Sequence, residues 1–129
     1  MSPTFRKNER LISQQIMDKL FSEGNSVKHY PFRLIWYTGP EVVEPFQVTI
    51  SVPKRRVNRA VRRNRIKRKI REAYRLNKDR WLGRLSGPTA AMLVYLDGAE
   101  RAQDEMEQKI CYLFERFLEE QGKREKWII

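Results

Sequence analysis

Hydrophobic positions near the start of the chain repeat at the spacing of a helix. Ile12, Ile16 and Leu20 are four residues apart, which places them on one side of a helix. The Gly-Asn pair at 24–25 is typical of a helix end. We therefore predict a first helix from about Asn8 to Ser22.

Other segments have the patterns of strands. From Gln47 to Val52, apolar and polar residues alternate, which favours a half-buried strand. The run AAMLVYL from Ala90 to Leu96 is almost continuously apolar and predicts a strand buried on both faces. Two more strands are predicted before these, a short one near Val27 and a clearer one from Phe32 to Tyr37.

Two further helices follow from the same kind of pattern. The segment from Ala60 to Lys78 contains no Gly or Pro and is rich in good helix formers. Amphipathic spacing also predicts a last helix from about Gln103 to Glu120. In the middle helix, the residues with the spacing of a buried stripe are Ile66, Ile70, Ala73 and Tyr74, and those of the opposite face are Asn64, Arg68, Arg71 and Arg75.

The predicted order is helix, strand, strand, strand, helix, strand, helix. Strands that form one sheet with helices packed against it give an α+β fold, here an α/β sandwich. At 129 residues the chain is long enough for one modest core and too short for two. We therefore predict a single domain over residues 1–129.

Positive charge is concentrated in one part of the chain. Residues 54–80 contain fourteen Lys and Arg side chains against Glu72 and Asp79, a net charge of +12, whereas the other 102 residues contain thirteen basic and fourteen acidic ones. A near-neutral domain with one strongly cationic helix indicates a polyanionic partner.

An ordinary solvated helix face is the simpler alternative for this charge. Such faces mix signs, whereas like charges at i,i+3 and i,i+4 cost stability. Residues 54–80 also contain ten Arg but only four Lys, and the planar guanidinium matches phosphate geometry. The pattern favours nucleic-acid binding, and charge alone does not separate RNA from DNA.

Other features of the sequence argue against several classes of protein. No apolar run approaches the roughly 20 residues of a membrane span, and the N-terminus has no signal-peptide core. The single Cys111 excludes an internal disulfide. Carboxylates are not clustered as a protein nuclease would require. We expect a cytoplasmic protein with no catalytic and no metal-ligating residues of its own.

The basic segment contains an ordered series of residues: Lys54-Arg55, Ala60-Val61, Arg63-Asn64-Arg65, Lys67-Arg68, Arg71 and Arg75. This series closely resembles the signature of the protein subunit of bacterial ribonuclease P. The resemblance implies a fold ordered αβββαβα with a left-handed crossover through the basic helix. General rules alone would favour a right-handed connection.

The resemblance also implies a function. In that family the protein binds the catalytic RNA and the 5′ leader of precursor tRNA, and so promotes maturation of the tRNA 5′ end. The RNA subunit, with bound Mg²⁺, performs the hydrolysis. By position, the residues predicted to bind the RNA subunit are Lys54, Arg55, Arg63, Asn64, Arg65, Lys67, Arg68, Arg71 and Arg75.

A cleft for the single-stranded leader is implied between the first helix and the sheet. The predicted cleft residues are Met17, Phe21, Phe32 and Trp36. Met17 stands where the family has an aromatic residue, and it lacks the flat ring on which a base stacks. On the strand, the sequence leaves open whether Phe32, Leu34 and Trp36 or Arg33, Ile35 and Tyr37 face the RNA.

Two other classes of function remain as alternatives. A structural RNA-binding protein, such as a ribosomal protein, shares the charge and size but needs no leader cleft. A sequence-specific DNA-binding protein would normally present a mixed polar set to the bases rather than an almost wholly cationic face. Nothing in the sequence indicates a protein partner, and a monomer is expected.

Overall fold

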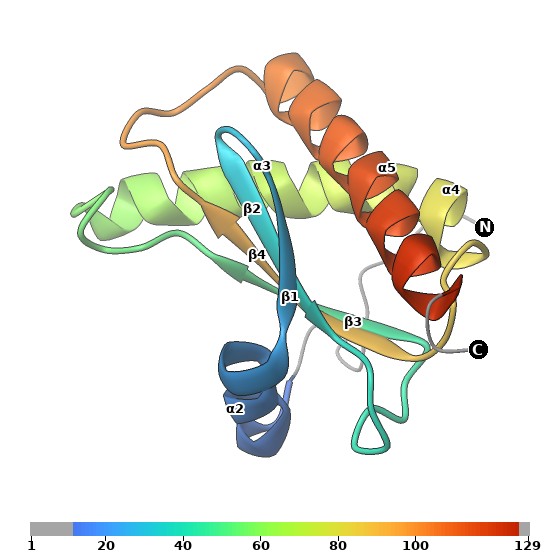
Figure 1. Cartoon of the computed structure of the whole chain (residues 1–129). Coiled ribbons are helices and arrows are strands. Elements are labelled where there is room, and N and C mark those ends of the chain that lie inside the picture. Colours follow the sequence, from blue (N-terminus) through green and yellow to red (C-terminus); the bar gives the residue numbers. More distant parts are fainter. Residues whose placement is uncertain (1–11, 127–129) are drawn as a thin grey trace.

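The computed structural model describes residues 12–126 and has a four-stranded sheet with helices on both faces (Figure 1). The mixed α+β fold agrees with the sequence prediction. In chain order the elements are α2 (Gln14–Glu23), β1 (Asn25–His29), β2 (Phe32–Tyr37), β3 (Phe46–Ser51), α3 (Ala60–Asn77), α4 (Asp79–Leu82), β4 (Thr89–Tyr95) and α5 (Gln103–Lys126).

The strands lie in the order β1-β2-β4-β3. Strand β2 pairs antiparallel with both β1 and β4, whereas β3 and β4 are parallel. A parallel pair needs a crossover connection, and here it runs through α3 and α4. The basic helix is therefore the crossover element, and the left-handed sense of the crossover stays a prediction.

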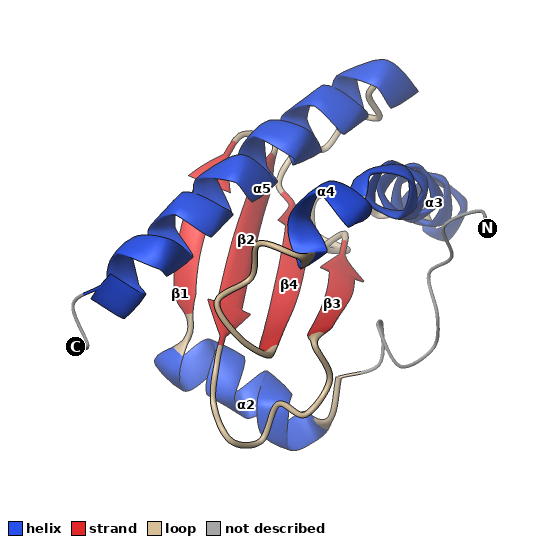
Figure 2. Cartoon of the chain, turned by 90° about the vertical axis from the view of Figure 1, so that its right-hand side faces the viewer, coloured by secondary structure: helices blue, strands red, loops and turns tan. Residues whose placement is uncertain are grey.

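Helices cover the two faces of the sheet unequally. Figure 2 shows α5, α3 and α4 on one side of the strands and α2 on the other, at one end of the sheet. Side-chain alternation explains how the strands serve both sides. On β2, Phe32, Leu34 and Trp36 join the main core, whereas Ile35 and Tyr37 pack with α2.

The main core lies between the sheet and the pair α3 and α5. Phe114 of α5 is at its centre, stacked on Trp81 of α4 with ring centroids 4.1 Å apart and also in contact with Tyr74 of α3. Phe46 of β3 completes the contact with the sheet. This aromatic cluster joins the crossover, the last helix and the strands into one packed unit.

The predicted elements agree with the structure except at their ends. Of the predicted first helix, residues 8–11 lie outside the described part of the chain, and α2 begins at Gln14, where the Ser13 hydroxyl accepts a hydrogen bond from the Ile16 amide. A short helix, α4, occupies a segment for which the sequence pattern predicts no element. It places Trp81 in the core, where the side chain is 1% exposed.

Helix α5 is longer than its predicted end at Glu120. Gln121 is buried, and its side-chain amide donates to the Thr89 hydroxyl at 2.8 Å and accepts from the Ser86 amide at 3.2 Å. These contacts to a loop and a strand far away in sequence extend the helix beyond its apolar stripe. Within residues 12–126, no helix is both long and apolar enough to cross a membrane.

The aromatic cluster predicts a large stability effect for Phe114→Ala. Truncating a fully buried Phe should lower the free energy of unfolding by about 3–5 kcal/mol, because Phe114 is 1% exposed. Urea denaturation followed by circular dichroism would measure the loss. Leu76→Ala is the control, since Leu76 is 50% exposed and should change stability by less than about 1 kcal/mol. Similar losses for the two variants would contradict the central position of Phe114.

Candidate nucleic-acid-binding surfaces

Helix α3 buries the stripe that its sequence predicts. Ile66, Ile70 and Ala73 are fully buried and Tyr74 is 1% exposed. Because these residues must face the core, the basic residues between them point outward. We call this outward side the basic ridge. Its members, which are the predicted RNA-subunit-binding residues, are all exposed or half-buried: Lys54, Arg55, Arg63, Asn64, Arg65, Lys67, Arg68, Arg71 and Arg75.

Some cations of the basic ridge are already engaged within the protein. The Arg63 guanidinium donates to the Val57 carbonyl at 3.0 Å, before the helix begins. Arg75 pairs with Glu72 one turn away, at 2.6 Å. Arg65 reaches Glu100 in the loop between β4 and α5, at 3.0 Å.

Glu100 also binds a second cation of α3. Its other carboxylate oxygen lies 2.8 Å from the Lys69 ammonium. Hydrogen bonds from Lys69 and Arg65 lower the pKa of the Glu100 carboxyl, because they favour its charged form. By contrast, Arg68 and Arg71 make no ion pair with any residue of the described part of the chain. On the outward side of α3, both guanidiniums are therefore available for phosphate.

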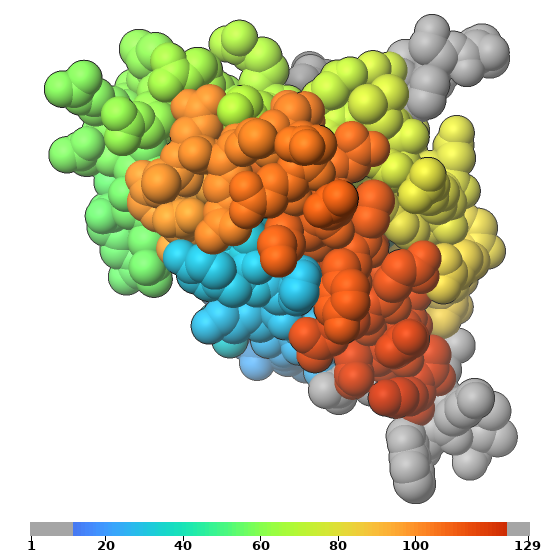
Figure 3. All heavy atoms as spheres, turned by 90° about the horizontal axis from the view of Figure 1, so that it is seen from above, coloured from blue at the N-terminus to red at the C-terminus, as the bar shows by residue number. Residues whose placement is uncertain are grey.

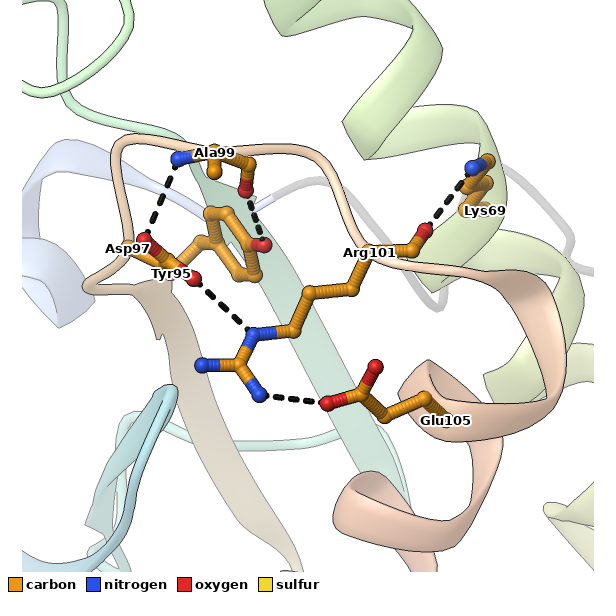
Figure 4. A network of polar contacts seen from close by, with 6 residues as sticks. All are labelled: Lys69, Tyr95, Asp97, Ala99, Arg101 and Glu105. Atoms are coloured by element: carbon orange, nitrogen blue, oxygen red, sulfur yellow. Dashed lines mark hydrogen bonds and ion pairs between the residues drawn. The ribbon is translucent and has the colours of Figure 1, made fainter.

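The loop that carries Glu100 is fixed by a polar network (Figure 4). Arg101 donates to Asp97 at 2.9 Å and to Glu105 at 2.6 Å, and so bridges the end of β4 to the start of α5. The buried Tyr95 hydroxyl donates to the Ala99 carbonyl at 2.6 Å. The loop can therefore present its carboxylates in fixed positions.

The same loop is tied to α3 by its backbone. The Lys69 ammonium donates to the Arg101 carbonyl at 2.8 Å, and the Gln103 side chain donates to the Lys69 carbonyl at 2.9 Å. Seen from above, the β4–α5 loop lies against the basic helix (Figure 3). The Arg101 guanidinium also lies over the Tyr30 ring at 5.4 Å, which connects the loop to the β1–β2 turn.

A second candidate surface lies on the side of the sheet that carries α2. We call it the open face, because α2 packs on only part of it. Phe21 on α2 is 68% exposed, whereas Met17 is half-buried and packs against the small core cluster that contains Ile16 and Leu20. Of the two helix residues predicted to line a cleft, Phe21 is thus the one free to stack on a base.

The assignment of Phe32 and Trp36 to the cleft is wrong for this structure. Phe32 is fully buried and Trp36 is 2% exposed, and both pack in the main core beneath α5. Alternation along β2 sends their side chains away from α2. The residues that share the side of α2 are Arg33, Ile35 and Tyr37. Strand alternation separates the two sets, but which set is covered by the longer helices depends on the tertiary packing.

Tyr37 is part of a polar group at the α2 end of the open face. Its hydroxyl donates to the Glu41 carboxylate at 2.6 Å. This bond lowers the pKa of Glu41 and raises the pKa of Tyr37. No periodic pattern in the sequence indicates this contact, because it depends on the conformation of the turn that follows β2.

No metal site is found in the described part of the chain. No group of three or more His, Cys, Asp or Glu side chains there is arranged to hold an ion. Asp97, the one carboxylate just after a buried strand, is bound by Arg101. We therefore assign no metal ligand among the described residues.

Comparison with known proteins finds the same family that the basic segment resembles. A family model described as "Ribonuclease P" matches residues 5–118. The chain belongs to the ribonuclease P protein family. Among its relatives, the ribonuclease P protein component of Porphyromonas gingivalis is 46% identical over 79 residues, which cover 59% of this chain and 58% of that protein. The component of Chlorobaculum tepidum is 46% identical over 68 residues, covering 49% of this chain and 44% of that protein.

Solved structures of the family share the fold. The ribonuclease P protein of Staphylococcus aureus superposes with a TM-score of 0.68 at 21% identity, covering 83% of this chain and 93% of that one. The protein of Thermotoga maritima gives a TM-score of 0.67 at 22% identity, covering 84% and 96%. The chain spans about half the length of the curated relatives named above.

The network behind Glu100 predicts a pH effect. Burial, with a smaller contribution from Asp97, raises the pKa of Tyr95 to about 12. The unfolded state, with a Tyr pKa near about 10, releases this proton first. The contribution of Tyr95 to the free energy of unfolding is therefore fully present below about pH 10. It should fall by about 2–3 kcal/mol as the pH rises to about 12.

Urea denaturation at several alkaline pH values would measure this slope. Tyr95→Phe should remove the part of this pH dependence that comes from the Tyr95 hydroxyl. Tyr112→Phe is the control, because Tyr112 is 55% exposed. Equal slopes for Tyr95→Phe and the wild-type chain would contradict the prediction.

Proposed function

We propose that this chain is the protein subunit of ribonuclease P, which binds the catalytic RNA and the 5′ leader of precursor tRNA and promotes removal of the leader. The observation that carries the proposal is the basic ridge on α3, in a chain whose family membership covers residues 5–118. The ridge presents Arg68 and Arg71 without carboxylate partners among the described residues.

The basic ridge would act mainly by electrostatics. Lys and Arg side chains that neutralise RNA phosphates release condensed counterions, which favours binding at low salt. Arg can in addition contact phosphate oxygens through two parallel hydrogen bonds. Because α3 is held on the core by its buried stripe, its backbone need not be ordered on binding, and only the cationic side chains lose freedom. The ridge would therefore position the RNA subunit relative to the sheet.

The open face would hold the leader. Single-stranded RNA is bound largely through stacking of bases on aromatic rings and through backbone contacts, both of which tolerate varied sequence. Phe21 is 68% exposed on the side of α2 that lies next to this face. Its ring offers a stacking position that the half-buried Met17 does not.

In this proposal the protein contributes binding and positioning, and the RNA subunit contributes the chemistry. Mg²⁺ would be held by the RNA and would supply stabilisation of charge at the cleaved phosphate. No carboxylate cluster of the described chain fits this ion. The protein would raise the affinity for precursor tRNA and would allow cleavage at lower Mg²⁺.

The direct test is cleavage of precursor tRNA by a bacterial ribonuclease P RNA at low Mg²⁺, with and without this protein. We expect strong stimulation, with the cut at the mature 5′ end. Affinity should also be higher for precursor than for mature tRNA. Tight binding to the RNA without stimulation, and without this preference, would instead indicate a structural RNA-binding protein.

The basic ridge is tested by combining Arg68→Ala and Arg71→Ala. This variant should bind the RNA subunit more weakly, and the slope of log affinity against log salt should flatten by about 2, one for each lost phosphate contact. Filter binding at several salt concentrations would measure both quantities. Arg84→Ala with Lys123→Ala removes the same charge from exposed positions near or on α5. An unchanged slope for the ridge variant, or an equal change in this control, would count against the ridge.

A further inference from the structure

The open face has a cationic end that lies away from α2. Figure 1 shows α2 at one end of the sheet only. The side chains under α2 include Tyr37, Ala90, Ile35 and Met92. Arg33 lies two residues before Ile35 on β2 and is exposed, so alternation places it on the same face. The face therefore continues from the residues covered by α2 to an exposed guanidinium.

Lys28 on β1 lies on the same face. Its neighbours point the other way, because Val27 is in the main core and His29 stacks on Tyr112 of α5 with ring centroids 4.1 Å apart. Alternation along the strand therefore directs Lys28 toward the side of α2. Strand pairing then puts Lys28 directly opposite Arg33.

Two like charges directly opposite each other in a sheet are destabilising. A carboxylate on an adjacent position would offset the repulsion, but among the described residues neither Lys28 nor Arg33 pairs with one. The other two positions of this row are Val94 and Ser51, which carry no charge. The pair thus costs stability and gains nothing within the chain, which indicates an anionic partner.

The row that contains this pair also leads toward the basic ridge. Ser51 is the last residue of β3, and the exposed Lys54 and Arg55 follow it in the loop before α3. The row therefore has the Lys28–Arg33 pair at one end, and at the other end the chain leads from Ser51 into the loop that carries Lys54 and Arg55. Such a row can accept a chain of phosphates without a competing acidic group.

We propose that Lys28 and Arg33 bind backbone phosphates of the single-stranded leader beyond its contact with α2. The inference rests on the proposed function and adds a direction to it: the leader would run along the open face from Phe21 toward the β1–β2 end of the sheet. Arg33 lies four positions before Tyr37 on β2, a distance of roughly 13 Å along the strand. Only a leader long enough to span that distance would reach the pair.

Leader length gives the test. The variant Lys28→Ala with Arg33→Ala is compared with the wild-type protein, each bound to a bacterial ribonuclease P RNA. For precursor tRNA with a leader of about eight nucleotides, affinity should fall roughly tenfold and the salt slope should flatten by about 1.4, since single strands contribute about 0.7 per phosphate. With a leader of about two nucleotides, neither quantity should change.

Three controls separate charge at this pair from other effects. Lys28→Arg with Arg33→Lys keeps both charges and should retain wild-type affinity for the long leader. Arg84→Ala with Lys123→Ala removes the same charge elsewhere and should affect both leaders equally and weakly. Because the alanine variant relieves a like-charge pair, it should melt at or above the wild-type temperature. An equal loss for long and short leaders, or no loss for the long one, would overturn the proposal.

A binding experiment without tRNA distinguishes failure of the Lys28–Arg33 proposal from failure of the proposed function. If the wild-type complex does not prefer precursor to mature tRNA, the proposed function fails. Binding of a labelled oligouridylate of about eight nucleotides to the protein alone then decides whether the pair binds single-stranded RNA. Weaker binding by the Lys28→Ala, Arg33→Ala variant than by the Arg84→Ala, Lys123→Ala control would support it. Equal binding by the two would overturn it.

Discussion

Burial of one apolar stripe on α3 is the constraint on which the rest of this structure depends. Ile66, Ile70, Ala73 and Tyr74 occupy the core between the sheet and α5, and this fixes the rotation of the helix about its own axis. Once that rotation is fixed, the cations of the helix have only the outward side. The hydrophobic effect, which has no direction of its own, here orients the most strongly charged element of the molecule.

The sheet divides the remaining roles between its faces. One face is occupied by α3, α4 and α5 and holds the aromatic cluster around Phe114. The other is covered by α2 at one end only, which leaves a surface on which exposed side chains and half-buried apolar ones meet. A sheet covered equally on both faces would be more stable but would have no room for an extended ligand. The short length of α2 is therefore consistent with a binding role for this face.

Much of this arrangement could be predicted from local patterns. The bounds of β2, the buried stripe of α3 and the element order follow from periodicity and from Gly and Pro positions, because each depends on neighbouring residues. The orientation of β2 could not be predicted. Alternation separates Phe32 and Trp36 from Arg33 and Tyr37 but does not say which set α5 covers. The end of α5 was also missed, because Gln121 is held by Ser86 and Thr89, which are distant in sequence.

The electrostatics of the basic ridge likewise cannot be obtained by counting charges. Arg65 and Lys69 share Glu100, and Arg75 pairs with Glu72. All of these groups are at least partly exposed, and such pairs contribute little to stability. An RNA phosphate can therefore replace a carboxylate at small cost, but it then releases fewer counterions than at an unpaired guanidinium. The loop between β4 and α5, held by Arg101, thus lowers the effective charge of one part of α3. In the proposed complex, strong and salt-sensitive binding would then rest on the ridge cations that have no carboxylate partner among the described residues, Arg68 and Arg71 among them, and on Lys28 and Arg33 of the open face.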